Sequence, residues 1–226
     1  YIPDIFGIRL LNHSLTEFNG LPLINLQASP LDGYNKSIKR CADLILSSII
    51  VILISPLMIL IAVVIKWTSP GPIIYRQTRI GLNNKPFKIM KFRTMKVGAE
   101  KSTGAVWATA GENRATRFGS FLRKTSLDEL PQFINVLKGN MSIVGPRPER
   151  PKFTKLFKDE ISYYMKKHFV KAGITGWAQV NGWRGSTDLN KRIEYDLYYI
   201  QHWSLLFDIK IILMTICRIC KDKNAY

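Results

Sequence analysis

Residues 44–65 read LILSSIIVILISPLMILIAVVI, a run of 22 positions without a charged side chain. As one straight helix this run measures about 33 Å at roughly 1.5 Å per residue, enough to cross a hydrocarbon core of about 30 Å. Ser55 and Pro56 stand at its centre. A proline inside a helix removes a backbone donor and clashes with the preceding turn, so the helix bends there. The sequence therefore predicts a membrane helix that is broken near its middle.

Basic residues flank this run on both sides, with Lys36, Lys39 and Arg40 before it and Lys66 after it. Such flanks favour the cytoplasmic side of a membrane. A single span places one flank on the far side, whereas a helix that enters, bends at Pro56 and leaves on the same face keeps both together. The residues alone leave both topologies open. We predict the re-entrant one, over about residues 38–67.

Composition narrows the class of protein. The 226 residues include 33 Lys and Arg against 16 Asp and Glu, a net charge of +17. This excess indicates an anionic partner, which is a nucleic acid, an anionic membrane surface or a phosphorylated substrate. Three cysteines exclude a disulfide scaffold, and one long apolar run excludes a polytopic bundle.

Residues 1–34 hold a single basic residue, so we expect 1–34 to be the tail of a preceding region and 35–226 to form the main domain.

The remaining sequence predicts an α+β fold that is predominantly helical. Two β-rich runs, 73–80 and 87–94, flank a turn and predict a small β-hairpin. Residues 152–167, 188–201 and 204–221 have helical apolar spacing. We interpret these segments as amphipathic helices at a membrane surface, with core packing of their apolar faces as the alternative.

Two adjacent carboxylates, Asp128 and Glu129, are the main candidates for chemistry. Residues 123–140 have helical spacing, and Ser126 with Glu129 three later fits a capping box, whereas Pro131 argues for a helix start nearer Asp128. Either start places both acids at the helix N-terminus. The helix dipole then favours an ionised Asp128 and a phosphate beside it. Acids in a first turn are ordinarily caps. An aspartate can also attack phosphorus and a neighbouring carboxylate can hold Mg²⁺, so the pair suits phosphoryl chemistry.

Basic residues around this pair are candidates for phosphate binding. Arg147 lies between Pro146 and Pro148, which stiffen the backbone and present its guanidinium with little loss of freedom. A rigid surface turn is the alternative. Lys91 and Arg93 lie in the predicted hairpin, where some cations are expected to face the membrane and others to contact a phosphate.

An ordered set of motifs resembles one family across about residues 35–226. The motifs are Lys39-Arg40-Cys41-Ala42-Asp43, KFRTM (91–95), TSLDELPQ (125–132), NVLKGNMSIVGPRP (135–148) and GITGWAQVNG (173–182). Together they resemble the bacterial sugar transferases, the monotopic polyprenol-phosphate phosphoglycosyl transferases. The leading segment, GPRPERPKF and the GWRGSTDLNKRIEYDLYYIQHWS stretch are most similar to the undecaprenyl-phosphate glucose phosphotransferases of exopolysaccharide assembly.

The resemblance implies a reaction at the cytoplasmic face of the bacterial inner membrane. A UDP-sugar, expected to be UDP-glucose, gives its sugar 1-phosphate to undecaprenyl phosphate and releases UMP, as the first membrane step of exopolysaccharide or capsule assembly. In the family the aspartate matching Asp128 is the nucleophile, and the glutamate matching Glu129 binds Mg²⁺. Arg147 is associated with the uridine, and Asp196 is a further substrate-binding residue.

The residue chemistry agrees with that reaction. Phosphoryl transfer depends on positioning and charge neutralisation, and Lys91, Arg93 and Arg123 would offset the diphosphate charge. Two alternatives remain: the same reaction with UDP-galactose or a UDP-N-acetylated amino sugar, or a non-catalytic, basic, membrane-anchored binding protein. For the enzyme we expect the inner membrane and its two substrates as partners and no nucleic acid, with a homodimer left open.

Overall fold

The computed structural model describes residues 14–18, 21–25, 30–31, 33–99, 115–161, 163–185 and 187–221. Most of the expected tail, residues 1–34, lies outside these ranges. In chain order the elements are β1 (Ser14–Phe18), β2 (Leu21–Asn25), α1 (Tyr34–Thr68), β3 (Ile74–Ile80), the 3-10 helix η1 (Leu82–Asn84), β4 (Pro86–Phe92), α2 (Arg117–Lys124), the 3-10 helix η2 (Leu127–Glu129), α3 (Gln132–Leu137), β5 (Ser142–Val144), α4 (Pro151–Glu160), the 3-10 helix η3 (Tyr164–Phe169), β6 (Gly173–Thr175), α5 (Trp177–Val180), α6 (Leu189–Gln201) and α7 (Leu205–Lys221).

The α+β, predominantly helical prediction is confirmed. The expected hairpin is the antiparallel pair β3 and β4, with Ile74 opposite Phe92 and Ile80 opposite Pro86. The helices predicted at 188–201 and 204–221 are α6 and α7. The predicted helix at 152–167 is two elements, α4 and η3, because the chain turns through Tyr163 in a left-handed conformation (φ 69°).

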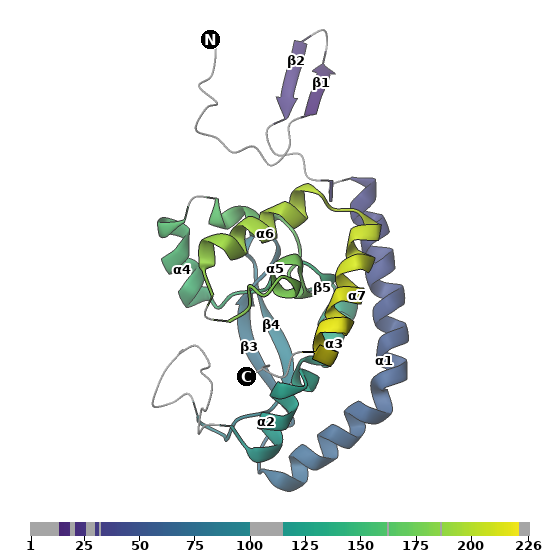
Figure 1. Cartoon of the computed structure of the whole chain (residues 1–226), viewed down its shortest axis with the longest axis vertical. Helices are drawn as coiled ribbons and strands as arrows, with labels where there is room; N and C mark the ends of the chain where they lie inside the picture. The colour runs from purple at the N-terminus through teal and green to yellow at the C-terminus, as the bar shows by residue number, and fades with distance from the viewer. Residues whose placement is uncertain are drawn as a thin grey trace.

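Helix α1 runs along one side of the molecule and bends in its second half (Figure 1). Pro56 lies inside it and cannot donate to the carbonyl of Ile52. The Ser55 hydroxyl donates to that carbonyl instead, at 2.8 Å. Among the described residues α1 is the one helix long and apolar enough to cross a membrane. The Ser-Pro pair thus permits a bend without leaving a carbonyl unpaired in an apolar setting.

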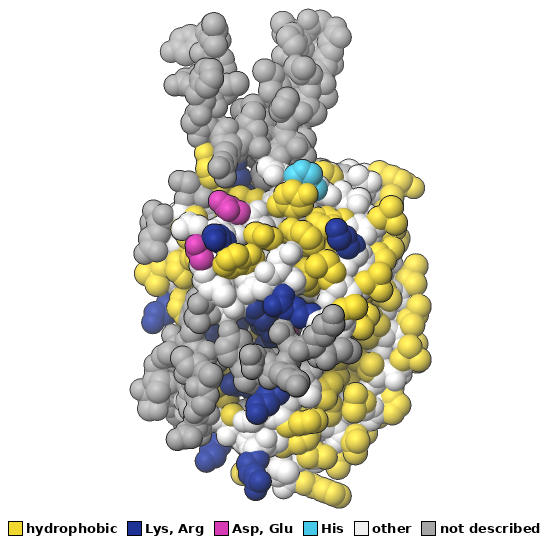
Figure 2. All heavy atoms as spheres, in the orientation of Figure 1, with side chains coloured by type: hydrophobic (Ala, Val, Ile, Leu, Met, Phe, Trp, Pro, Cys, Tyr) yellow, Lys and Arg dark blue, Asp and Glu magenta, His cyan; other side chains and the backbone are white. Residues whose placement is uncertain are grey.

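Both ends of α1 pack against the rest of the chain, while its middle is exposed. Lys39, Asp43 and Ser47 are buried near the start, and Ile61 and Ile65 near the end. Between them the side chains of Ile52 and Leu53 are 71% and 72% exposed. Figure 2 shows hydrophobic side chains along the edge of the molecule where α1 runs. Isoleucine and leucine exposed in such a continuous stripe indicate contact with lipid.

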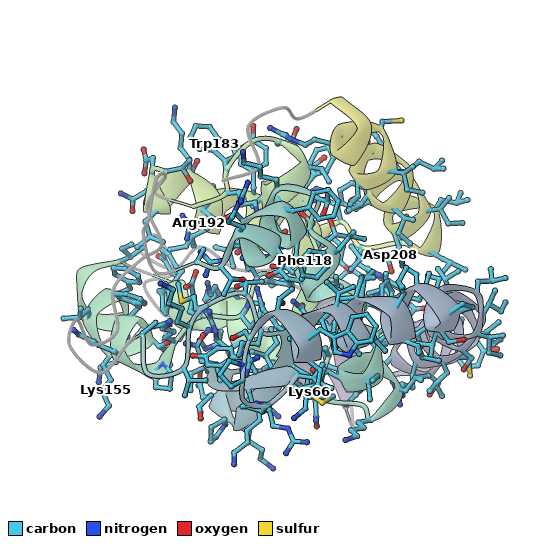
Figure 3. All side chains as sticks on the ribbon, turned by 90° about the horizontal axis from the view of Figure 1, so that it is seen from below. Lys66, Phe118, Lys155, Trp183, Arg192 and Asp208 are labelled. Atoms are coloured by element: carbon cyan, nitrogen blue, oxygen red, sulfur yellow. The ribbon has the colours of Figure 1, made fainter. Side chains whose placement is uncertain are left out.

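A buried ionic network fastens the start of α1 to α7 and β5. Lys39 Nζ donates to Asp208 Oδ2 at 2.7 Å, and Trp203 Nε1 donates to the same oxygen at 3.1 Å. Tyr199 donates to Asp208 Oδ1 at 2.8 Å, and the Ile143 N–H of β5 donates to Asp43 at 3.1 Å. Figure 3 shows Asp208 between α7 and α1. The network therefore fixes the membrane helix relative to the strand that leads into Arg147.

We expect Asp208→Ala to lower the free energy of unfolding by about 3–5 kcal/mol, because it leaves the buried Lys39 ammonium with only the longer contact to Asp43 at 3.7 Å and removes the acceptor of Tyr199 and Trp203. The measurement is unfolding of the detergent-solubilised protein, with the exposed Glu194→Ala on α6 as the control, expected to change stability by less than about 0.5 kcal/mol. Equal stabilities for the two variants would contradict this role for Asp208.

Candidate active site

A cavity of about 670 Å³ opens beside the hairpin, a size that suits a small-molecule ligand. Six sequence-predicted site residues line it: Lys91, Arg93, Arg123, Asp128, Glu129 and Arg147. Asp196 is not among its lining residues and is 2% exposed. Figure 2 shows Lys and Arg side chains gathered on the middle and lower part of one face. The fold thus brings together residues that lie far apart in the sequence.

The two carboxylates lie in η2, and the capping box predicted at Ser126 is wrong. Ser126 adopts a left-handed conformation with φ 56°, and its side chain makes no capping hydrogen bond. The α-helix begins only at Gln132, because Pro131 has no N–H to donate and so is tolerated only at a helix start. Asp128 and Glu129 therefore stand in a tight bend between α2 and α3, with each residue 8% exposed.

Glu129 is held by cations from three other parts of the chain. Its Oε1 lies 2.7 Å from Lys91 Nζ, 2.9 Å from Arg147 Nη2 and 3.7 Å from Arg184 Nη2. Burial alone would raise the pKa of Glu129, but Arg147, Lys91 and Arg184 outweigh it and hold that pKa well below its ordinary value. Glu129 is therefore a fixed anion across the physiological range.

Burial dominates the electrostatics of Asp128. It raises the pKa of this carboxyl, Glu129 raises it further, and Lys91, Arg123 and Arg184 oppose the rise. The sequence predicted the opposite influence, from the dipole of a long helix, which η2 with three residues does not supply. A buried carboxylate beside a second one that stays ionised is more basic than an ordinary aspartate.

The predicted cations Arg93 and Arg123 have structural partners. Arg93 Nη2 donates to the Ser69 carbonyl at 2.6 Å, which ties the end of α1 to the hairpin. Arg123 Nε donates to Thr94 Oγ1 at 3.0 Å. Gly119 allows α2 to approach this strand end, since a Cβ there would lie 2.0 Å from the Thr94 carbonyl oxygen. These contacts place both guanidinium groups at the cavity wall.

Several lining residues were not among the site residues predicted from the sequence. Arg184 is the third cation on Glu129, and Arg79, Glu149 and Arg192 also line the cavity. The available signal for Arg184 was its position between Gly182 and Gly185, both of which have positive φ and mark a built turn. The roles of Glu149 and Arg192 depend on contacts between distant segments, which no local pattern displays.

A cavity wall that carries these cations suits substrates with anionic phosphate groups. Transfer of a phosphoryl group requires neutralised charge and a positioned nucleophile more than strong acid–base catalysis. Cations from β3, β4, α2 and two loops can neutralise the charge, and Asp128 can act as the nucleophile. The apolar surface of α1 restricts the class to proteins that act on such substrates at a membrane.

The family model described as bacterial sugar transferase matches residues 34–222, and the chain belongs to this family. It is 50% identical, over its full length, to the UDP-glucose:undecaprenyl-phosphate glucose-1-phosphate transferases of Escherichia coli (strain K12) and Klebsiella pneumoniae, covering 49% of each. It is 46% identical over 96% of its length to the UDP-N-acetylgalactosamine-undecaprenyl-phosphate N-acetylgalactosaminephosphotransferase of Aeromonas hydrophila, covering 52% of that protein. The chain therefore spans about half the length of these curated relatives.

Proposed function

We propose that this chain transfers glucose 1-phosphate from UDP-glucose to undecaprenyl phosphate and releases UMP. The observation that carries the proposal is the pairing of buried Asp128 with Glu129, whose carboxylate is held by Lys91, Arg147 and Arg184. A merely basic binding protein has no need of two carboxylates inside a cation-lined cavity. Membership of the bacterial sugar transferase family supports the same reaction.

Transfer proceeds in two successive displacements at the same phosphorus atom. A carboxylate oxygen of Asp128 attacks the β-phosphorus of UDP-glucose, an O–P bond forms, and the bond from that phosphorus to the bridging oxygen breaks, so that UMP leaves with the electron pair. A phosphate oxygen of undecaprenyl phosphate then attacks the phosphosugar on Asp128 and displaces the carboxylate. Lys91 and the arginines of the cavity wall bind the diphosphate and orient it for attack.

Mg²⁺ is the proposed cofactor, and the donor set fits it. Mg²⁺ is usually bound by one or two carboxylates together with substrate phosphates. Glu129 lines the cavity as an ionised carboxylate with Asp128 beside it, and the described residues hold no cluster of three Asp, Glu, His or Cys that could form an all-protein site. Glu129 would hold the ion. When bound, Mg²⁺ offsets the charge of the diphosphate.

The sugar is the least constrained part of the proposal. The similar proteins of E. coli and K. pneumoniae are named as glucose-1-phosphate transferases, and that of A. hydrophila is named for N-acetylgalactosamine. Greater identity to the glucose proteins supports UDP-glucose.

We expect the purified protein in detergent, with undecaprenyl phosphate and Mg²⁺, to release UMP from UDP-glucose faster than from UDP-galactose or UDP-N-acetylgalactosamine. Excess EDTA should abolish the release, because the cation that offsets the diphosphate charge is removed. Glu129→Gln should weaken the Mg²⁺ dependence. UMP release that is unchanged in EDTA would contradict the proposed Mg²⁺ requirement. Preference for another UDP-sugar would contradict UDP-glucose as the donor but not the transfer reaction. No UMP release from any donor would favour a basic binding protein.

A further inference from the structure

A second charged cluster lies behind the cavity wall. It consists of Glu149 from the turn after β5, Lys167 of η3, and Arg192 and Asp196 of α6. These residues are 6%, 1%, 5% and 2% exposed, respectively. Burial of four ionisable side chains is costly and is weak evidence of a stabilising role, since apolar residues of similar size often stabilise as well or better. The cluster therefore invites a functional explanation.

Glu149 is the centre of this cluster. Its Oε1 lies 3.2 Å from Arg192 Nη1 and 3.7 Å from Lys167 Nζ. Burial alone would raise its pKa, but Lys167, Arg192, Arg79 and Arg147 together lower it, so Glu149 is ionised. Its backbone carbonyl accepts from the Ile80 N–H of β3 at 2.9 Å. Glu149 thus fixes the turn in which Arg147 stands two residues earlier.

Arg192 extends the cluster to a second part of the cavity wall. Its Nη1 contacts Glu149, and its Nη2 donates to the carbonyl of Gly185. Gly185 directly follows Arg184 in the chain. Figure 3 shows Arg192 directed into the body of the molecule from α6. The Glu149–Arg192 pair therefore supports both segments whose arginines, Arg147 and Arg184, contact Glu129.

Asp196 lies one helical turn beyond Arg192 on α6, so the two side chains share a face of that helix. Its Oδ2 is buried and has no hydrogen-bond partner among the described residues, and the same is true of Lys167 Nζ. With Asp196 ionised, the cluster holds two negative and two positive charges. With Asp196 protonated, it carries an uncompensated positive charge close to Arg79 and Arg147, which themselves act on Glu149.

We propose that Asp196 is a positioning residue, which acts from behind the cavity wall to balance Lys167 and Arg192 around Glu149 and thereby keeps Arg147 and Arg184 in place on Glu129. This inference rests on the proposed phosphosugar transfer, and it replaces the direct substrate contact that the family resemblance implied for Asp196. Without the second carboxylate, both cations converge on Glu149 alone and repel the neighbouring guanidinium groups, so the two supported segments shift.

Because Asp196 can be protonated, the positioning of Arg147 and Arg184 is expected to depend on pH. Lys167 of η3, Glu149 of the turn and Arg192 of its own helix act on Asp196 directly. Tyr164 and His168 of η3 interact with Lys167, and Arg79 of β3 interacts with Glu149. Burial raises the pKa of Asp196 from 3.8 to about 7, Glu149 adds to the rise, and Lys167 and Arg192 oppose it. Glu149 and Lys167 remain charged in this range, since the pKa of the Glu149 carboxyl is lowered and that of the Lys167 ammonium is raised. His168 stays neutral, with its pKa lowered to about 4 chiefly by burial.

The test compares Asp196→Asn with the wild type in full transfer assays between about pH 6 and pH 8. Asparagine keeps the shape and removes the charge, so we expect kcat at pH 8 to fall about tenfold, as small misplacements in an active site do. The ratio of wild-type to variant kcat should shrink toward one at pH 6, while KM for UDP-glucose changes less than about twofold. Taking this ratio cancels the titration of the substrate phosphates. Asp188→Asn, at the exposed N-cap of the same helix, is the matched control and should leave kcat unchanged.

Thermal unfolding gives a readout that does not depend on turnover. The folded chain binds a proton on Asp196 up to about pH 7, whereas the unfolded chain releases it near 3.8, so this group makes the wild type less stable as the pH rises between these values. Asp196→Asn removes this loss, and its unfolding midpoint relative to the wild type should rise from pH 5 to pH 8. A residue with a purely structural role would lose stability and activity together at every pH.

Three outcomes would overturn the proposal. One is a kcat ratio that does not depend on pH, and another is an increase in KM with unchanged kcat, which would indicate direct donor contact. The third is a midpoint difference that stays constant between pH 5 and pH 8. If the wild type releases no UMP from any UDP-sugar while the midpoint difference shifts as expected, the proposed transferase function fails and the buried charge coupling stands, so the two failures are distinguishable.

Discussion

Replacing Asp128 with asparagine is expected to reduce UMP release by at least about 1000-fold, the scale at which loss of a nucleophile acts. The amide has the shape of the carboxyl but has no anionic oxygen to attack phosphorus. Asp128 is buried beside Glu129, whose carboxylate is held by Lys91, Arg147 and Arg184, so we do not expect Glu129 to replace it as the nucleophile. The variant should still bind UDP-glucose, since the cations of the wall are unchanged.

Covalent labelling separates this role from a structural one. Incubation with UDP-glucose labelled in the β-phosphate, without undecaprenyl phosphate, should label the wild-type protein and the Asp188→Asn control but not Asp128→Asn. Equal unfolding midpoints for the three proteins would show that the loss is chemical. Substantial turnover or labelling of Asp128→Asn would remove Asp128 as the nucleophile.

Predictions from the sequence were successful for elements that a local residue pattern determines. The uncharged run at 44–65 predicted most of α1, and the β-rich runs at 73–80 and 87–94 predicted the hairpin to within two residues. The residues Lys91, Asp128, Glu129 and Arg147 were each singled out before their spatial arrangement was known, and they share one cavity. The adjacency of the two carboxylates, the hairpin position of Lys91 and the prolines around Arg147 identified them without any contact information.

The features that sequence reasoning missed all depend on contacts between distant segments. The parallel pair of β5 and β6 joins Ser142 to Gly173 through strands of three residues each, too short for a periodic pattern. The backbones of Gly173 and Gly145 approach closely, since a Cβ at Gly173 would lie 2.1 Å from the Gly145 nitrogen. The sequence alone does not indicate this contact. Arg184 and Glu149 likewise acquire their roles from partners that η2 and α6 bring to them.

Both ends of α1 are expected to lie on the cytoplasmic face of the membrane. Lys39 and Asp43 at its start, and Ile61 and Ile65 near its end, pack against the same domain. A spanning helix would separate these ends by a hydrocarbon core of about 30 Å, which the domain could not bridge without entering the lipid. Bending at Pro56 keeps the two ends on one side and brings the cavity close to the phosphates of membrane lipids.

Thiol accessibility tests this topology in the full-length protein. The substitutions Ser37→Cys and Thr68→Cys place single thiols at exposed positions at the start and end of α1, in a background from which the native cysteines have been removed. In intact spheroplasts both thiols should resist an impermeant reagent, and both should react after permeabilisation. Mid-helix proline costs roughly 3 kcal/mol in a straight helix, so Ser55→Ala combined with Pro56→Ala should allow part of the population to span and expose residue 37 outside. Reaction of the Ser37→Cys thiol from outside while Ser55 and Pro56 are intact would establish a span, because an apolar helix without a return path must place its two basic flanks on opposite faces.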